Sequence, residues 1–138
     1  MRLTLDDIEA IMAWPLTVLG SDGEMDGVHP RGYGAFTRYL GHYVRDRGVV
    51  SLEEGVRRVS SMPAEQVGIH GRGLIEEGRY ADLVLFDPDT IIDRATPDAP
   101  HTTSVGIDKV WVNGELVFSD EAVTGNLPGM TIRRGDDR

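Results

Sequence analysis

Hydrophobic residues near the start of the chain recur at the spacing of an amphipathic helix. Four residues share one face: Leu5, Ile8, Ile11 and Met12. Thr4 precedes them, where a threonine hydroxyl can accept a hydrogen bond from the third helical amide. Pro15 cannot continue a helix, because it lacks an amide proton and its ring clashes with the preceding turn. The pattern therefore predicts a first helix that ends before Pro15.

The next hydrophobic run has a different pattern. Residues 16–19, Leu-Thr-Val-Leu, are apolar without alternation, which is typical of a parallel strand covered on both faces. The run ends in Gly-Ser-Asp-Gly at residues 20–23, a turn signal. We therefore predict a buried parallel strand over residues 16–19, with a polar loop directly after it.

Three further helices are predicted between residues 33 and 68. The first covers residues 33–47, and Gly48 follows it where a left-handed cap is typical. The second begins at Ser51, three residues before Glu54, which is the spacing of a capping box. The third is short and ends at Gly68. One apolar stripe supports the longest helix: Phe36, Tyr39, Leu40, Tyr43 and Val44.

The second half of the chain changes to a glycine-punctuated β pattern. Residues 83–86, Leu-Val-Leu-Phe, read as a strand. Residues 107–112 and 116–118 are apolar runs separated by Asn-Gly, the strongest short-range signal for a hairpin. From Ser119 onward, glycine, proline and charge predict a tail that is ordered only if other residues hold it.

Composition limits the classes of partner. The 138 residues carry a net charge of −9, which repels phosphate backbones and anionic bilayers. Cysteine is absent, which excludes disulfides and thiolate chemistry and is compatible with a reducing cytosol. No apolar run approaches the roughly 20 residues that span a bilayer, and the first residues lack a signal-peptide pattern. We therefore expect a cytoplasmic protein that binds neither nucleic acid nor membrane.

Asp22 is the first candidate for chemistry. It follows a predicted buried strand, and α/β sheets and barrels place ligand-facing groups at the carboxyl ends of such strands. The same aspartate, with glycines close by on both sides, can equally accept neighbouring amide protons as an Asx turn. Its position alone leaves both interpretations open.

The His29-Pro30-Arg31 triplet is the second candidate. An arginine fork can hold a substrate carboxylate through two hydrogen bonds, and a preceding proline would stiffen its presentation. A solvated loop is the competing interpretation. Three other histidines lie in polar or exposed contexts and are expected to be ordinary surface residues: His42, His70 and His101.

Several phrases of the sequence together resemble the C-terminal portion of D-aminoacylases, the N-acyl-D-amino-acid deacylases of the amidohydrolase superfamily. They are Gly-Ser-Asp-Gly at 20–23, His-Pro-Arg at 29–31, Leu-Gly-His-Tyr-Val at 40–44, Ser-Leu-Glu-Glu at 51–54, Met-Pro-Ala at 62–64, Gly-Leu-Ile-Glu-Glu-Gly at 73–78, Ala-Asp-Leu-Val-Leu-Phe-Asp at 81–87 and Val-Asn-Gly at 112–114. The resemblance runs nearly end to end. The first two phrases point to the deacylase branch, and the 73–87 stretch and the Asn-Gly turn mark the superfamily more generally.

The resemblance implies an α+β chain in two parts. Residues 1–70 would be the end of a (β/α)₈ metal-dependent hydrolase barrel, namely its last strand at 16–19 with helices. Residues 71–138 would be the C-terminal part of a small β-sandwich domain with a tail. Asp22 would be the general base that activates a zinc-bound water for attack on a linear amide. Arg31, and less directly His29, would clamp the carboxylate of an N-acyl amino acid, with Ser21 and Gly23 as further substrate contacts.

The chain departs from the family in its metal ligands. The family's zinc ligands, which include histidines and a cysteine, lie on earlier strands that are absent here. A catalytic zinc needs about three protein ligands and an open position. We therefore expect zinc in the complete enzyme, none bound to this chain alone, and no catalysis by the isolated chain.

Three explanations account for a chain without the earlier barrel strands: an expressed fragment, a split or truncated gene, or a subunit completed in trans by a barrel segment. A partial barrel exposes apolar faces, so a homo-oligomer is also expected. Two alternatives to the deacylase remain. One is a non-catalytic α+β module that acts through oligomerisation or partner binding, and the other is a dihydroorotase-like hydrolase of cyclic amides.

Overall fold

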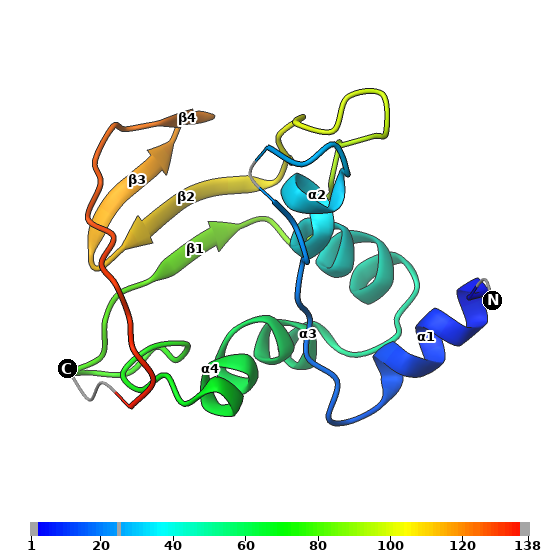
Figure 1. Ribbon diagram of the computed structural model, residues 1–138, viewed down its shortest axis with the longest axis horizontal. Helices are drawn as coiled ribbons and strands as arrows, with labels where there is room; N and C mark the ends of the chain where they lie inside the picture. The colour runs from blue at the N-terminus through cyan, green and yellow to red at the C-terminus, as the bar shows by residue number, and fades with distance from the viewer. Residues whose placement is uncertain (1–2, 25, 136–138) are drawn as a thin grey trace.

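The computed structural model describes residues 3–24 and 26–135, which form a group of helices beside one antiparallel sheet (Figure 1). The helices come first along the chain: α1 (Leu5–Ala13), α2 (Arg31–Arg38), the π-helix η1 (Tyr39–Asp46), α3 (Leu52–Val59) and α4 (Ser61–Val67). The strands follow: β1 (Leu83–Phe86), β2 (Ile107–Val112), β3 (Glu115–Ser119) and β4 (Ala122–Val123). The α+β class predicted from the sequence is confirmed.

The helix starts follow the capping signals in the sequence. Thr4 accepts a hydrogen bond from the amide of Asp7, whose carboxylate in turn accepts from the amide of Thr4. Ser51 accepts from the amide of Glu54 at the start of α3. These bonds satisfy amides that the first turn of a helix leaves without a partner. Two helix starts are thus set by side chains only three residues apart.

The predicted helix over residues 33–47 is corrected in two respects. It begins at Arg31, and it changes from α to π geometry at Tyr39. Gly41 packs against the carbonyl of Ile91, because a Cβ at Gly41 would lie only 2.1 Å from that oxygen. The close approach brings residues 39–46 against the segment after β1, where the core forms. Four residues make up that core: Tyr39, Leu40, Val44 and Ile91.

The strand predicted over residues 16–19 is absent from the structure. Leu16 is 68% exposed, and the amide of Thr17 closes a turn on the carbonyl of Trp14. Leu19 donates its amide to the carbonyl of Arg58 in α3, not to a strand. A strand is stabilised by hydrogen bonds to a neighbour, and none of the described residues supplies one at this position. The segment is therefore extended but unpaired.

The first three strands follow the predicted β pattern, whereas β4 (Ala122–Val123) lies in the segment predicted to be a tail. The strand order is β1-β2-β3-β4, and every neighbouring pair is antiparallel. Asn113 and Gly114 have φ of 51° and 83°, so the tight turn between β2 and β3 has the positive φ values that the Asn-Gly pair predicts. The described residues form one sheet layer, so the second layer of the expected β-sandwich is not present within them.

A polar cluster holds the hairpin, the connector and the tail together. Arg72 lies over the ring of Tyr80 at 4.1 Å, pairs with Asp82 and donates to Asn113 at 2.6 Å. Asn113 in turn donates to the carbonyl of Pro128 at 2.6 Å. Residues outside the tail thus hold it along this side of the molecule, which is the condition that the sequence sets for its order. No helix within the described residues is long and apolar enough to cross a membrane.

Candidate functional site

The five residues singled out from the sequence lie on one loop, the 20–32 loop, defined as residues 20–24 and 26–32. The loop leaves the extended segment that follows α1 and runs into the first turn of α2 (Figure 1). The structure brings all five onto this short stretch: Ser21, Asp22, Gly23, His29 and Arg31. Its geometry decides which of them can act together.

Asp22 presents its carboxylate to solvent. Its φ is 47°, in the left-handed region that aspartate tolerates better than most residues. Its side chain is 85% exposed. The amide of Gly23 donates to the hydroxyl oxygen of Ser21 at 3.2 Å, so the turn is closed by the serine side chain. Within the described residues, Asp22 is left available for an interaction outside its own turn.

Arg31 makes that interaction. Its Nη2 lies 2.8 Å from Oδ2 of Asp22, and its side chain is 46% exposed. An exposed ion pair of this kind contributes only about 0–1 kcal/mol, because water screens the charges. Arg31 can therefore exchange Asp22 for another carboxylate at little cost.

Two glycines allow Asp22 and Arg31 to come together. A Cβ on Gly23 would lie 2.4 Å from the Cα of Gly32, so the two ends of the loop touch backbone to backbone. Any side chain at Gly23 would separate them. The contact explains how residues 22 and 31, nine positions apart, come to share an ion pair. Gly23, predicted as a substrate contact, thus also has a geometric role in closing the loop.

His29 is oriented by the backbone. Its Nδ1 accepts a hydrogen bond from the amide of Arg31 at 3.1 Å, at the start of α2. Nδ1 of His29 is therefore engaged by the main chain. This hydrogen bond attaches the imidazole to the main chain of Arg31 at the start of α2.

Within the described residues, no group of three or more histidine, cysteine or acidic side chains is arranged to hold a metal ion. A catalytic zinc needs about three protein ligands, so the residues around Asp22 do not by themselves fit such a group. A metal at this site would require ligands from other polypeptide, as the sequence analysis expects.

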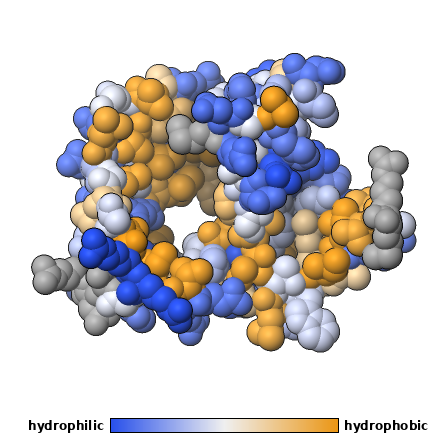
Figure 2. All heavy atoms as spheres, viewed as in Figure 1, coloured by the Kyte–Doolittle hydropathy of each residue, from blue (hydrophilic) through white to orange (hydrophobic). Residues whose placement is uncertain are grey.

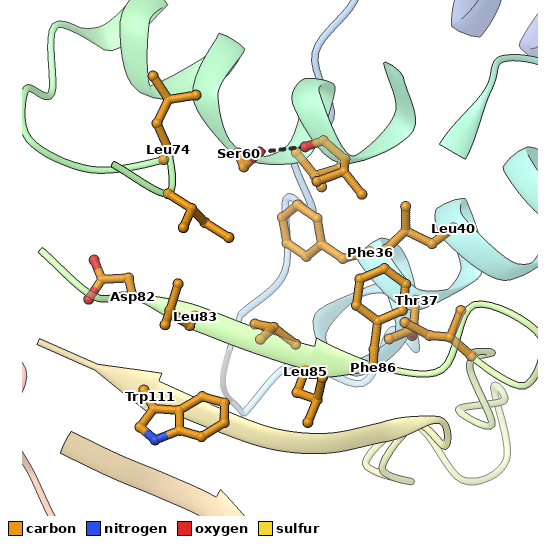
Figure 3. Close-up of a pocket in the computed structure, with 16 residues that line it drawn as sticks. Phe36, Thr37, Leu40, Ser60, Leu74, Asp82, Leu83, Leu85, Phe86 and Trp111 are labelled. Carbon is orange, nitrogen blue, oxygen red and sulfur yellow. Dashed lines mark hydrogen bonds between the residues drawn. The ribbon is translucent and has the colours of Figure 1, made fainter. Parts of the chain in front are cut away.

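A separate apolar groove lies between the helices and β1. Its volume is about 650 Å³, and none of the five loop residues lines it. Figure 2 shows hydrophobic side chains around a hollow at this position, and Figure 3 shows Phe36 and Leu74 across it from Leu83 of β1. The groove is therefore an apolar surface distinct from the charged loop.

The residues that hold the loop from outside are not among the sequence motifs. His101 was expected to be an ordinary surface histidine, but its Nε2 lies 3.1 Å from the carbonyl oxygen of Gly27 and its ring lies 5.2 Å from that of Tyr33. Ser104 donates to the carbonyl of Tyr33 at 3.3 Å. These contacts join positions more than 65 apart in the chain, and no local pattern predicts them.

Comparison with known proteins places the chain in a family. The sequence model of the amidohydrolase family matches residues 1–118. The D-aminoacylase of Alcaligenes xylosoxydans xylosoxydans is 42% identical over 130 residues, which are 93% of this chain and 27% of that protein.

Solved structures agree with the sequence comparison. A crystal structure of D-aminoacylase superposes with a TM-score of 0.91 at 41% identity and covers 96% of this chain and 28% of that one. The N-acyl-D-glutamate deacylase of Bordetella bronchiseptica, solved with zinc and a phosphonate inhibitor, gives 0.82 at 44% identity and covers 86% of this chain and 25% of that one. The chain thus spans little more than a quarter of its relatives' length. It belongs to the amidohydrolase family, and D-aminoacylases are among its similar relatives over that part of their length.

Proposed function

We propose that the chain is the C-terminal segment of a zinc-dependent N-acyl-D-amino-acid deacylase. Residues 1–70 would come from the end of the barrel, and residues 71–138 from the small β domain. Two relatives support the substrate class: the protein similar over 93% of the chain is a D-aminoacylase, and another, 42% identical over 132 residues, is an N-acyl-D-aspartate deacylase. The single observation that carries the proposal is the exposed Asp22 carboxylate paired with Arg31 on one loop.

Asp22 would act as the general base. Its carboxylate would accept a proton from the attacking water as the carbon–oxygen bond forms, and would return that proton to the amine as the carbon–nitrogen bond breaks. Water is thus added across the amide bond, and the products are a carboxylic acid and a free amino acid. Since its side chain points to solvent, not into its own turn, the carboxylate can meet a substrate that other polypeptide helps to enclose.

Arg31 would bind the carboxylate of the amino-acid half of the substrate. A guanidinium offers two parallel N–H donors to a carboxylate, and the exposed pair with Asp22 is weak enough to be displaced. Binding of substrate would then release Asp22 from its partner at the moment the base is needed. His29, Ser21 and Gly23 would complete the polar surroundings of the bound amino acid.

Zinc in the complete enzyme would be held by residues outside the described part of this chain. A solved D-aminoacylase has a binuclear metal centre, and the deacylase of Bordetella bronchiseptica binds zinc. We assign no metal ligand to Asp22 or to the histidines of this chain. Completion by a barrel segment is thus part of the proposal.

A chimera tests the proposal, with this chain replacing the matching segment of the Alcaligenes D-aminoacylase. We expect zinc-dependent release of a D-amino acid from its N-acetyl derivative. Asp22→Asn should lower kcat by about 10²–10⁴-fold, since general-base catalysis contributes on that order. Asp26→Asn, a change of the same kind on the same loop, serves as the control. An Asp22→Asn chimera as active as its parent would contradict the role of Asp22.

A further inference from the structure

The 20–32 loop has few attachments of its own to the body of the protein. Asp22, Glu24, Val28 and His29 are exposed, and the hydrogen bond of Gly27 to Glu24 lies within the loop. A loop that carries a base and a carboxylate clamp must hold both in a fixed geometry, because small displacements lower catalytic rates steeply. Residues outside the loop are therefore needed to hold it in place.

The segment opposite is the 93–105 loop, defined as residues 93–105. In Figure 1 it passes over the start of α2, beside the 20–32 loop. Ile92 and Val105 exchange amide hydrogen bonds of 3.3 and 3.1 Å at its base. Thr37, buried in α2, lies 2.6 Å from the hydroxyl of Ser104. The two ends of the 93–105 loop are thus joined to each other, and its C-terminal end is attached to α2.

A second attachment joins the 93–105 loop to α2. Asp93 pairs with Arg38 at 3.3 Å, and its Cβ lies 2.8 Å from where a Cβ on Gly34 would be. Because Gly34 is buried, this contact leaves no room for the loop to move toward the helix. The 93–105 loop is therefore held in place by α2, and a side chain of this loop can contact the 20–32 loop.

His101 is that side chain. Its ring lies beside Tyr33 in the first turns of α2, with centroids 5.2 Å apart and planes tilted by 45°. Its Nε2 reaches the carbonyl oxygen of Gly27, in the middle of the 20–32 loop, at 3.1 Å. The tilted ring contact with Tyr33 orients the imidazole, and its Nε2 meets a carbonyl that can only accept a hydrogen bond. The contact thus requires a proton on Nε2.

We propose that His101 is a positioning residue, which holds the 20–32 loop so that Asp22 and Arg31 face one substrate. It would touch neither the substrate nor the reacting atoms. The proposal rests on the proposed function for its catalytic meaning, but the attachment itself is a property of this chain. The residues that form this attachment are Gly27 on the 20–32 loop and His101, Tyr33 and Ser104 outside it.

Amide hydrogen exchange of Gly27 and Gly32 tests the attachment without any catalysis. Both amides are hydrogen-bonded within the loop region, to Glu24 and His29, so their exchange reports how often the loop opens. His101→Ala should speed exchange by about fivefold, the effect of one lost hydrogen bond. His101→Gln should restore exchange to within about twofold, because its amide nitrogen reaches about as far as Nε2 and still donates. His101→Asn is too short and should behave like the alanine variant.

His70→Ala is the matched control, since His70 is an exposed histidine in the connector after α4. In the chimera with the Alcaligenes enzyme, the same series should lower kcat/KM for His101→Ala and restore it for His101→Gln. The inference is overturned if His101→Ala leaves exchange unchanged, if asparagine rescues as well as glutamine does, or if His70→Ala has the same effect. An inactive chimera with the expected exchange pattern would count against the deacylase function alone.

Discussion

At the scale of single residues, the candidate site depends on two close contacts. Gly23 meets Gly32 backbone to backbone, and the loop so closed brings Asp22 within 2.8 Å of Arg31. Neither contact involves a buried side chain. The loop is therefore shaped by the absence of side chains at two positions, while the two charged groups stay open to a ligand.

Arg31→Glu in the chimera tests the carboxylate clamp. Reversal of charge should raise KM for an N-acetyl-D-amino acid by at least about tenfold, because a charge-assisted hydrogen bond of about 1.5–3 kcal/mol becomes a repulsion. Steady-state kinetics at saturating zinc measures the change. Arg79→Glu, which alters the net charge equally in the distant connector, should leave KM within about twofold. An unchanged KM for Arg31→Glu would exclude the clamp.

At the scale of elements, α3 holds the N-terminal helix to the body of the protein through one buried cation. Arg58 is 4% exposed, donates to Glu54 at 2.7 Å and also reaches the carbonyl of Met12 at the end of α1. Glu54 also binds Arg57 at 2.7 Å. These hydrogen bonds from two guanidinium groups lower the pKa of Glu54 from its ordinary 4.5 to about 2.

Glu54→Gln should therefore change the acid sensitivity of the fold. A carboxylate whose pKa is lower in the folded state stabilises that state above the unfolded pKa, and this stabilisation is lost as the pH falls from 4.5 toward 2. The urea midpoint of the wild type should exceed that of the variant at pH 6. The difference between the two midpoints should become smaller as the pH falls from 4.5 toward 2. Glu77→Gln, on the exposed connector, provides the control. A gap that stays constant from pH 6 to pH 3 would refute the assignment.

At the scale of the whole molecule, the chain exposes an apolar surface that its own residues do not cover. Val84 and Leu85 of β1 are 54% and 50% exposed beside the groove of about 650 Å³. Among the described residues, β1 has a neighbouring strand on one side only, so its other edge can accept a further strand. A sheet edge next to an apolar groove favours association with other polypeptide.

The chain should accordingly be larger than a monomer when its solution mass is measured by light scattering. Leu85→Glu places a charge on the open edge and should shift the mass toward the monomer, because burial of the charge opposes association. Leu127→Glu makes the same change at a 94% exposed position of the tail and should leave the mass unaltered. A monomeric wild type at tens of micromolar would contradict the expectation.

Elements whose signals are local can be predicted from the order of residues along the chain. The helix starts at Thr4 and Ser51 and the turn at Asn113 depend on residues at most four positions apart, so their patterns are readable along the chain. The resemblance to deacylases is likewise a property of short phrases, and the amidohydrolase match over residues 1–118 confirms the family. These features need no knowledge of what lies nearby in space.

Other features depend on contacts between distant parts of the chain and are seen only in the folded molecule. Residues 16–19 have the composition of a strand, but a strand exists through hydrogen bonds to a neighbour, and here Leu19 meets Arg58 of a helix instead. The ion pair of Asp22 with Arg31 arises from a backbone contact, and the hold of His101 on Gly27 joins residues 74 positions apart. Composition and periodicity describe what a segment can pair with, whereas the fold determines which partner is within reach.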